Sequence, residues 1–210
     1  MLSLEYLSKI GRVKRVTCMM MQDRGATNVG DRDIVAMTDL QVASKFLTAA
    51  IKDKKSLASS LSAKYVVDCK SIFVMFVDLN YDEAKKREKM VSCDQVKAAI
   101  QEWKAAATDY LILIVSAKLS PDAKKEAALP RVSIMTHEFL TFPVARHCMV
   151  PKHTKLSQEH KSEFLEARKL ESKQLPILRL TDPVAAYYGY EVDDVIRVQR
   201  PGWEVYRVVL

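Results

Sequence analysis

The chain has 210 residues, 49% of them apolar, which is enough for one large domain or two small ones. Its 33 Lys and Arg residues against 26 Asp and Glu residues give a formal net charge of +7, a mild excess that permits a polyanionic partner without requiring one. Only 5 residues are glycine, so nucleotide-binding folds with glycine-rich phosphate loops are nearly excluded. Gly25 and Gly30 have the spacing of such a loop, but Asp31 and Arg32 stand where it needs Lys and Ser or Thr.

Neither a membrane span nor a secretory signal is expected. The longest uncharged apolar stretches, 110–117 and 71–77, are far shorter than the roughly 20 residues that cross a bilayer. Basic residues interrupt the first fifteen positions, so a continuous apolar signal core is missing there. The cysteines are scattered singly, which is typical of a soluble protein in a reducing compartment.

The first two thirds of the chain alternate between helix-like and strand-like patterns. Apolar residues three and four apart predict helices, and the run 110–115, apolar on both sides, predicts a strand in the middle of a covered sheet. Ser120, Pro121 and Asp122 are typical of a helix start. In chain order we expect helices over 2–21 and 40–51, a loop over 52–64, strands over 65–67 and 72–77, a charged turn or helix start over 82–89, a helix over 96–107, a strand over 110–115, a helix from 121, and strands over 132–135 and 140–144.

Short, proline-marked elements replace this alternation near residue 145. Ser157 can cap a helix that runs to about Leu170, and Asp182-Pro183 followed by Gly189 predicts a short helix. Two strand-like runs, 195–199 and 203–210, flank Arg200-Pro201-Gly202 as a terminal hairpin. We therefore predict an α/β domain over 1–145 and a small α+β domain over 146–210.

The patterns that carry enzyme chemistry are weak. His137, His147, Cys148, His153 and His160 fit no zinc-ligand spacing, and no nucleophile elbow is present. A nuclease hypothesis rests on Asp68, Lys70 and Asp78, but short Asp-x-Lys strings are common by chance. We expect no catalytic residue, no metal and no cofactor.

Lysines in the predicted loops and helix starts of the first domain could meet nucleic-acid phosphates. Base-reading motifs are absent, so such contact would follow the backbone without reading sequence and would weaken with salt. The alternative is that the lysines only solubilise the surface. They are Lys52, Lys54, Lys55, Lys85, Lys86, Lys89, Lys118, Lys124 and Lys125.

An ordered series of short motifs carries a family resemblance. In order and spacing they are similar to subunit 5 of eukaryotic nuclear RNA polymerases and to its shorter archaeal counterpart. The likeness is firm over 147–207 and faint before about residue 105. The motifs are His147-Cys-Met-Val150-Pro151-Lys-His153, Leu156-Ser157, Gln174-Leu175-Pro176, Asp182-Pro183-Val184-Ala185, Tyr187-Tyr188-Gly189 and Tyr206-Arg207, with Gln22-Asp23-Arg24-Gly25 and Leu119-Ser120-Pro121-Asp122-Ala123-Lys124 upstream.

The resemblance implies a non-catalytic, nuclear polymerase subunit. Its first domain would be a jaw over downstream duplex DNA, with a fold related to restriction endonucleases. Its second would be an assembly domain that docks on the largest polymerase subunit, without a membrane or small-molecule partner. A free-standing DNA-binding or adaptor protein is the alternative, and an active nuclease is a more distant one.

The resemblance also selects site residues. Proline-fixed backbone and amphipathic tyrosine rings suit an interface. Those expected at the assembly interface are His147, Val150, Pro151, His153, Gln174, Leu175, Pro176, Tyr187, Tyr188, Tyr206 and Arg207, with Tyr187, His147 and Arg207 favoured for direct contact; those expected near DNA are Lys118, Pro121, Lys124 and Lys125.

Two departures from the family pattern stand out. The basic turn usual after Tyr188-Gly189 is here Glu191-Val192-Asp193, with its charge reversed, and the final hairpin is about five residues shorter. These changes suggest a diverged form that serves a single polymerase class; a form dedicated to the ribosomal RNA polymerase would lie in the nucleolus.

Overall fold

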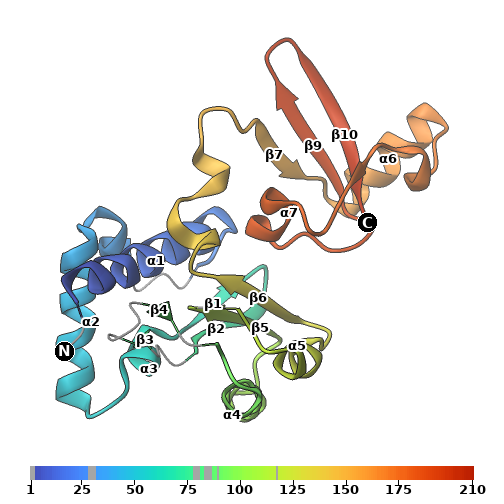
Figure 1. Ribbon diagram of the computed structural model, residues 1–210. Helices are drawn as coiled ribbons and strands as arrows, with labels where there is room; N and C mark the ends of the chain where they lie inside the picture. The colour runs from blue at the N-terminus through green and yellow to red at the C-terminus, as the bar shows by residue number, and fades with distance from the viewer. Residues whose placement is uncertain (1–2, 28–31, 78–80, 83–86, 89, 117) are drawn as a thin grey trace. The chain divides into compact units, whose positions relative to one another are not determined.

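The computed structural model describes residues 3–27, 32–77, 81–82, 87–88, 90–116 and 118–210 (Figure 1). The chain divides into two compact units, Met1–Phe142 (unit 1) and Pro143–Leu210 (unit 2), whereas the sequence pattern placed the division near residue 145. Each unit contains a four-stranded sheet together with helices. The expected mixed α/β class is therefore confirmed.

Unit 1 is built around a sheet with strand order β1-β2-β5-β6, in which β1 and β2 are antiparallel and the other neighbours are parallel. Parallel neighbours need crossover connections, and α4 and α5 supply them. The strands are β1 Ala63–Val67, β2 Lys70–Phe76, β5 Tyr110–Val115 and β6 Val132–Thr136, with a separate ladder of β3 Tyr81–Asp82 and β4 Arg87–Glu88; the helices are α1 Leu4–Asp23, α2 Asp39–Asp53, α3 Leu57–Leu61, α4 Cys93–Ala105 and α5 Pro121–Ala127, with short 3-10 turns η1 Arg32–Ala36 and η2 Phe139–Thr141.

The core of unit 1 lies on both faces of this sheet. On one face, Phe73 of β2 and Leu111 of β5 pack with Val96 and Ile100 of α4 and with the alanines of α5. In Figure 1 the sheet lies between α4 and α5 on one side and α1 on the other. Strand β5 is interior and almost fully buried, as its run of apolar residues predicts.

Helices α1 and α2 pack closely at Gly11. A Cβ built on Gly11 would lie 1.8 Å from the backbone oxygen of Asp39, so only glycine permits this approach. The side chain of Asp39 accepts a hydrogen bond from Arg12 Nε at 2.8 Å and forms an ion pair with Arg15 Nη2, also at 2.8 Å. Backbone contact and charge pairing therefore fix the start of α2 against α1.

A lysine lies inside unit 1, which the sequence pattern did not predict. Lys14 is 1% exposed, and its Nζ donates to the carbonyl oxygen of Leu61 at 2.9 Å and lies 5.1 Å from the ring centre of Phe46. The Oη of Tyr65 is 3.5 Å away. A carbonyl and two aromatic faces thus surround the ammonium group, which ties α1 to the end of α3.

Three sequence predictions in unit 1 are corrected. The segment 52–64, expected as a loop, contains α3, because Ala58 and Leu61 are buried. The segment 140–144, expected as a strand, forms 3-10 turns, and buried Leu140 anchors η2. The charged segment 82–89 belongs to the β3–β4 ladder at Asp82 and at 87–88, while 83–86 and 89 lie outside the described residues.

Unit 2 has a sheet of order β7-β9-β10-β8, parallel only between β10 and β8. The helix caps predicted at Ser157 and Asp182 are confirmed, as is Gly189 at the end of α7, with φ +69°. The predicted terminal hairpin is also confirmed, and Pro201-Gly202 forms its turn. The elements are β7 Lys152–Lys155, β8 Ile177–Leu178, β9 Val195–Arg200, β10 Trp203–Val209, α6 Gln158–Arg168 and α7 Pro183–Tyr188, with 3-10 turns η3 Val144–Arg146 and η4 Ser172–Gln174.

Each face of this second sheet carries its own small core. Ile196, Val198 and Val209 pack with Ala185 of α7, whereas Val195 and Val208 pack with residues of α6. The two helices therefore lie on opposite faces of the sheet (Figure 1). Because successive side chains of a strand point to opposite faces of the sheet, alternate residues of β9 and β10 meet α7 and α6 in turn.

Candidate assembly surface and DNA-facing loop

The residues predicted for the assembly interface all lie in unit 2, but not on one surface. Tyr206 and Arg207 are neighbours on β10, so their side chains leave the sheet on opposite faces. Tyr206 stacks on Phe164 of α6, with ring centres 4.0 Å apart, and Arg168 covers both rings. The ring of Tyr206 thus packs against α6.

The opposite face carries three basic residues and one tryptophan, all of them half-buried or exposed. We call this set the basic face, and it consists of His153, Arg200, Trp203 and Arg207. The registers of β7 with β9 and of β9 with β10 place these four on one side of the sheet. The Arg200 guanidinium lies 5.0 Å from the ring centre of Trp203, which is 56% exposed. An exposed aromatic ring beside an arginine is a composition typical of interface centres.

The pKa of His153 on this face is lowered from its ordinary value. Burial lowers its pKa most, and the charges of Arg207 and Arg200 lower it further, while a hydrogen bond to the Pro151 carbonyl and the charge of Asp182 oppose the shift. The Nδ1 atom lies 2.7 Å from that carbonyl oxygen, which can only accept, so Nδ1 carries a proton. Through this hydrogen bond His153 fixes the backbone before β7.

Other predicted interface residues differ widely in accessibility. Tyr187 is 1% exposed and Leu175 is 8% exposed, so these side chains pack inside unit 2 and offer almost no surface. Tyr187 meets Tyr188 edge-on at 5.5 Å, and Tyr188 stacks on Tyr190, whose pKa is raised by burial. The more accessible ones are His147, Gln174 and Pro176, which are exposed, and Val150, Pro151 and Tyr188, which are half-buried.

The residues predicted near DNA are brought together in unit 1. Lys118, Pro121, Lys124 and Lys125 are all exposed, on the connection that follows β5 and on the first turns of α5. Ser120 Oγ accepts from the backbone N–H of Ala123 at 3.2 Å, which fixes the start of the helix. The loop therefore presents its lysines from an ordered base.

The acidic turn that the sequence shows at 191–194 is paired with lysines, which the sequence did not predict. Asp193 adopts φ +71° and its carboxylate accepts from Lys161 Nζ at 2.5 Å, while Asp194 pairs with Lys155 Nζ at 2.8 Å. Lys161 also donates to the backbone oxygen of Asp193 at 2.7 Å. The reversed charge of this turn is thus matched within the unit, by lysines too distant in sequence to be found from spacing.

Asp193→Asn should weaken unit 2 by about 1 kcal/mol at neutral pH, because it removes the charge but keeps a residue that tolerates positive φ. The hydrogen bond from Lys161 lowers the pKa of Asp193 in the folded protein. The pair therefore adds stability above the unfolded pKa of about 3.9 and loses it as pH falls through the lower folded pKa. Urea denaturation at pH 7 and at pH 2 checks this, and an equal difference at both values would contradict it.

Little in the described part of the chain resembles a catalytic centre. No group of three His, Cys, Asp or Glu side chains there is placed to hold a metal ion. Asp68 lies in the β1–β2 turn at φ +46°, and Lys70 Nζ lies 3.3 Å from Tyr110 Oη; Asp78 lies outside the described residues. None of the described helices is long and apolar enough to span a bilayer.

Comparison with known proteins finds a domain match in unit 2 and similar polymerase subunits. The family model for the RNA polymerase Rpb5 C-terminal domain matches residues 142–209. The chain is 25% identical over 197 residues to the DNA-directed RNA polymerases I, II, and III subunit RPABC1 of Caenorhabditis elegans, covering 92% of this chain and 89% of that protein. It is 31% identical over 137 residues to the corresponding subunit of Dictyostelium discoideum, covering 62% of this chain and 65% of that protein.

The match to the domain coincides with unit 2, and the likeness to the nematode protein extends through unit 1. These findings show that residues 142–209 match the Rpb5 C-terminal domain and that the chain as a whole is similar to RPABC1-type polymerase subunits.

Proposed function

We propose that this protein is a non-catalytic subunit of a nuclear DNA-directed RNA polymerase. The observation that carries the proposal is the coincidence of the Rpb5 C-terminal domain match, residues 142–209, with the separately folded unit Pro143–Leu210. The names of the similar nematode and Dictyostelium proteins, which are polymerase subunits, support it. A nuclear location follows from this role.

Unit 2 docks on the largest polymerase subunit. Its basic face offers two arginines and an exposed tryptophan, and the neighbouring segments add exposed His147, Gln174 and Pro176. A permanent subunit contact buries on the order of 2,000 Å² or more in total, which requires a large part of the surface of so small a unit. Unit 2 is therefore the assembly domain in this proposal.

Removal of unit 2 should abolish incorporation into the polymerase. A tagged chain ending at Phe142 is expected to sediment as a free protein, whereas the full chain should co-sediment with a complex of several hundred kilodaltons. Affinity purification from cells of the source organism, followed by identification of the co-eluting chains, is the measurement. Full-level recovery of polymerase subunits with the truncated chain would overturn the docking assignment, and their absence with the full chain would overturn the proposed function.

Unit 1 forms a jaw beside downstream duplex DNA, with a fold related to restriction endonucleases. Its mixed sheet with parallel crossovers suits such a fold, and the ordered loop with Lys118, Lys124 and Lys125 supplies cations for phosphates. Contact of this kind reads no sequence and depends on salt.

Replacing Lys118, Lys124 and Lys125 together by alanine should reduce the salt dependence of DNA binding by the assembled polymerase. Loss of three phosphate contacts lowers the slope of log affinity against log salt concentration by about 2 to 3. Binding of a downstream duplex to the purified complex, titrated at several salt concentrations, gives the slope. Exposed Lys104 on α4 provides the matched control, and an unchanged slope in the triple variant would contradict a DNA-facing loop.

A further inference from the structure

Helix α2 has an outward face that is more apolar than packing within unit 1 requires. It buries Val42, Ala43 and Ala50 against the rest of unit 1. On its other side, Leu40 is 45% exposed and Ile51 is 73% exposed, and Leu47 is half-buried. Leu40 and Ile51 bound the apolar pattern that predicts this helix, yet both side chains are exposed.

The exposed residues follow the repeat of a helix–helix seam. Leu40, Ser44, Leu47 and Ile51 succeed one another at intervals of four, three and four residues, and we call this set the α2 stripe. Alternate spacings of three and four place side chains on one line along a helix and are the pattern by which one helix packs along another. With 15 residues, α2 is about 22 Å long, enough for two such repeats.

A shallow hollow runs beside the stripe. It has a volume of about 530 Å³ and is lined by Met37, Gln41, Ser44, Lys45 and Thr48. Its lining includes the short side chains of Ser44 and Thr48, which leave room between the longer side chains around them. Side chains from a second helix could enter at this point as knobs into holes.

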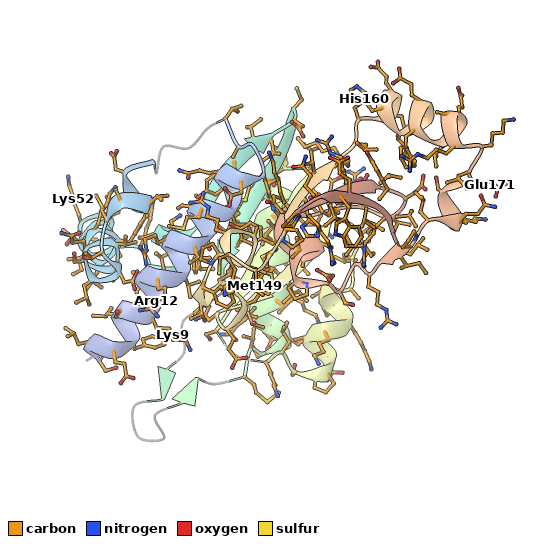
Figure 2. All side chains as sticks on the ribbon, turned by 90° about the horizontal axis from the view of Figure 1, so that it is seen from above. Lys9, Arg12, Lys52, Met149, His160 and Glu171 are labelled. Atoms are coloured by element: carbon orange, nitrogen blue, oxygen red, sulfur yellow. The ribbon has the colours of Figure 1, made fainter. Side chains whose placement is uncertain are left out.

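The flank of the stripe is basic. Lys45 and Lys52 are exposed and lie one heptad apart on the helix, and Lys54 and Lys55 follow at its end. Figure 2 shows Lys52 on the side of α2 turned away from α1. Of the two acidic residues in α2, Asp39 is paired with Arg12 and Arg15, and Asp53 follows Lys52, so the four lysines leave this end of unit 1 with a net positive charge.

We propose that the α2 stripe docks one amphipathic helix of another protein, with apolar residues at heptad spacing and acidic residues opposite Lys45 and Lys52. The apolar stripe supplies burial, and the lysines select the partner by charge. A second copy of this chain does not fit as well, since it brings the same lysines against each other. Duplex DNA would use the lysines but would leave Leu40, Leu47 and Ile51 uncovered.

The test uses the full chain and two synthetic helical peptides as probes. Both carry leucine and isoleucine at heptad spacing over three repeats, one with glutamate and the other with lysine at the flanking positions. Fluorescence anisotropy should show at least tenfold tighter binding of the glutamate peptide. Lys45→Glu with Lys52→Glu should reverse this preference, and Leu40→Ser with Ile51→Ser should weaken both peptides at least tenfold.

Controls lie in the same unit away from the stripe: Lys104→Glu on α4, and Leu129→Ser, whose side chain is 39% exposed. Neither should change binding by more than twofold, and circular dichroism checks that each variant folds. Equal binding of the two peptides, or binding insensitive to the α2 substitutions, would overturn the proposal. Two other outcomes would also overturn the proposal, because each assigns the stripe to a different occupant. One is self-association of the chain in sedimentation that Ile51→Ser abolishes. The other is binding of duplex DNA that is lost in the Lys45→Glu, Lys52→Glu variant.

Discussion

Gly11→Ala should destabilise unit 1 by about 2 kcal/mol. Alanine improves the helix propensity of α1 by about 1 kcal/mol, but the new methyl group would overlap the backbone oxygen of Asp39, 1.8 Å away. Overpacking of this kind costs about 3 kcal/mol when the neighbour is backbone, so the clash outweighs the gain. The separation of α1 from α2 would also lengthen the pairs from Arg12 and Arg15 to Asp39.

Urea denaturation followed by the fluorescence of Trp103 measures this effect. The chain has 2 tryptophans, one in each unit, so a Trp203→Phe background isolates the signal of unit 1. Ser8→Ala, on the same helix, changes propensity without the clash and should be neutral or slightly stabilising. A Gly11→Ala protein as stable as Ser8→Ala would show that α1 and α2 can shift apart freely.

Tyr187→Ala should unfold unit 2 and thereby remove the protein from the polymerase. Truncating a fully buried aromatic side chain costs about 3–5 kcal/mol, and Tyr187 is 1% exposed. A unit of this size has a total stability of only ~3–10 kcal/mol. The loss of incorporation would then come from lost folding rather than from a lost contact.

Hydrogen exchange of the β9–β10 amides, measured by mass spectrometry, separates these two causes. In Tyr187→Ala the amides should exchange rapidly, in parallel with the loss of co-purified polymerase subunits. Tyr188→Ala is the matched neighbour, since its ring is half-buried, and it should keep most of its protection. If Tyr187→Ala keeps its exchange protection and still loses the polymerase, the residue contacts a partner directly.

Local signals in the sequence predicted much of the fold. Ser120-Pro121 and Asp182-Pro183 start helices because cap and proline chemistry acts within a few residues, and Gly189 ends one for the same reason. The strand expected over 140–144 is wrong because an apolar run does not show whether its residues alternate between two faces or turn around one anchor, here Leu140. Strand β7 was missed because Lys152–Lys155 is polar throughout and forms a strand by pairing with β9, which is distant in sequence.

The candidate site could be predicted only in part. Motif resemblance selected Tyr206 and Arg207 together, although strand alternation sends them to opposite faces. The resemblance likewise could not show that Tyr187 is buried, since an aromatic residue suits both a core and an interface. The sequence pattern predicted the helix that carries the α2 stripe. It could not predict which apolar residues of that helix face inward, because this depends on where α1 packs against it.

The enclosure of Lys14 has a consequence for its chemistry. An amine acylates only when a reagent reaches its lone pair, and the aromatic rings and the Leu61 carbonyl around Lys14 bar that approach in the folded chain. Exposed Lys52, Lys54 and Lys55 lie open to the same reagent. Covalent labelling of Lys14 is therefore confined to moments when α1 has separated from α3, so the extent of its modification records how often unit 1 opens.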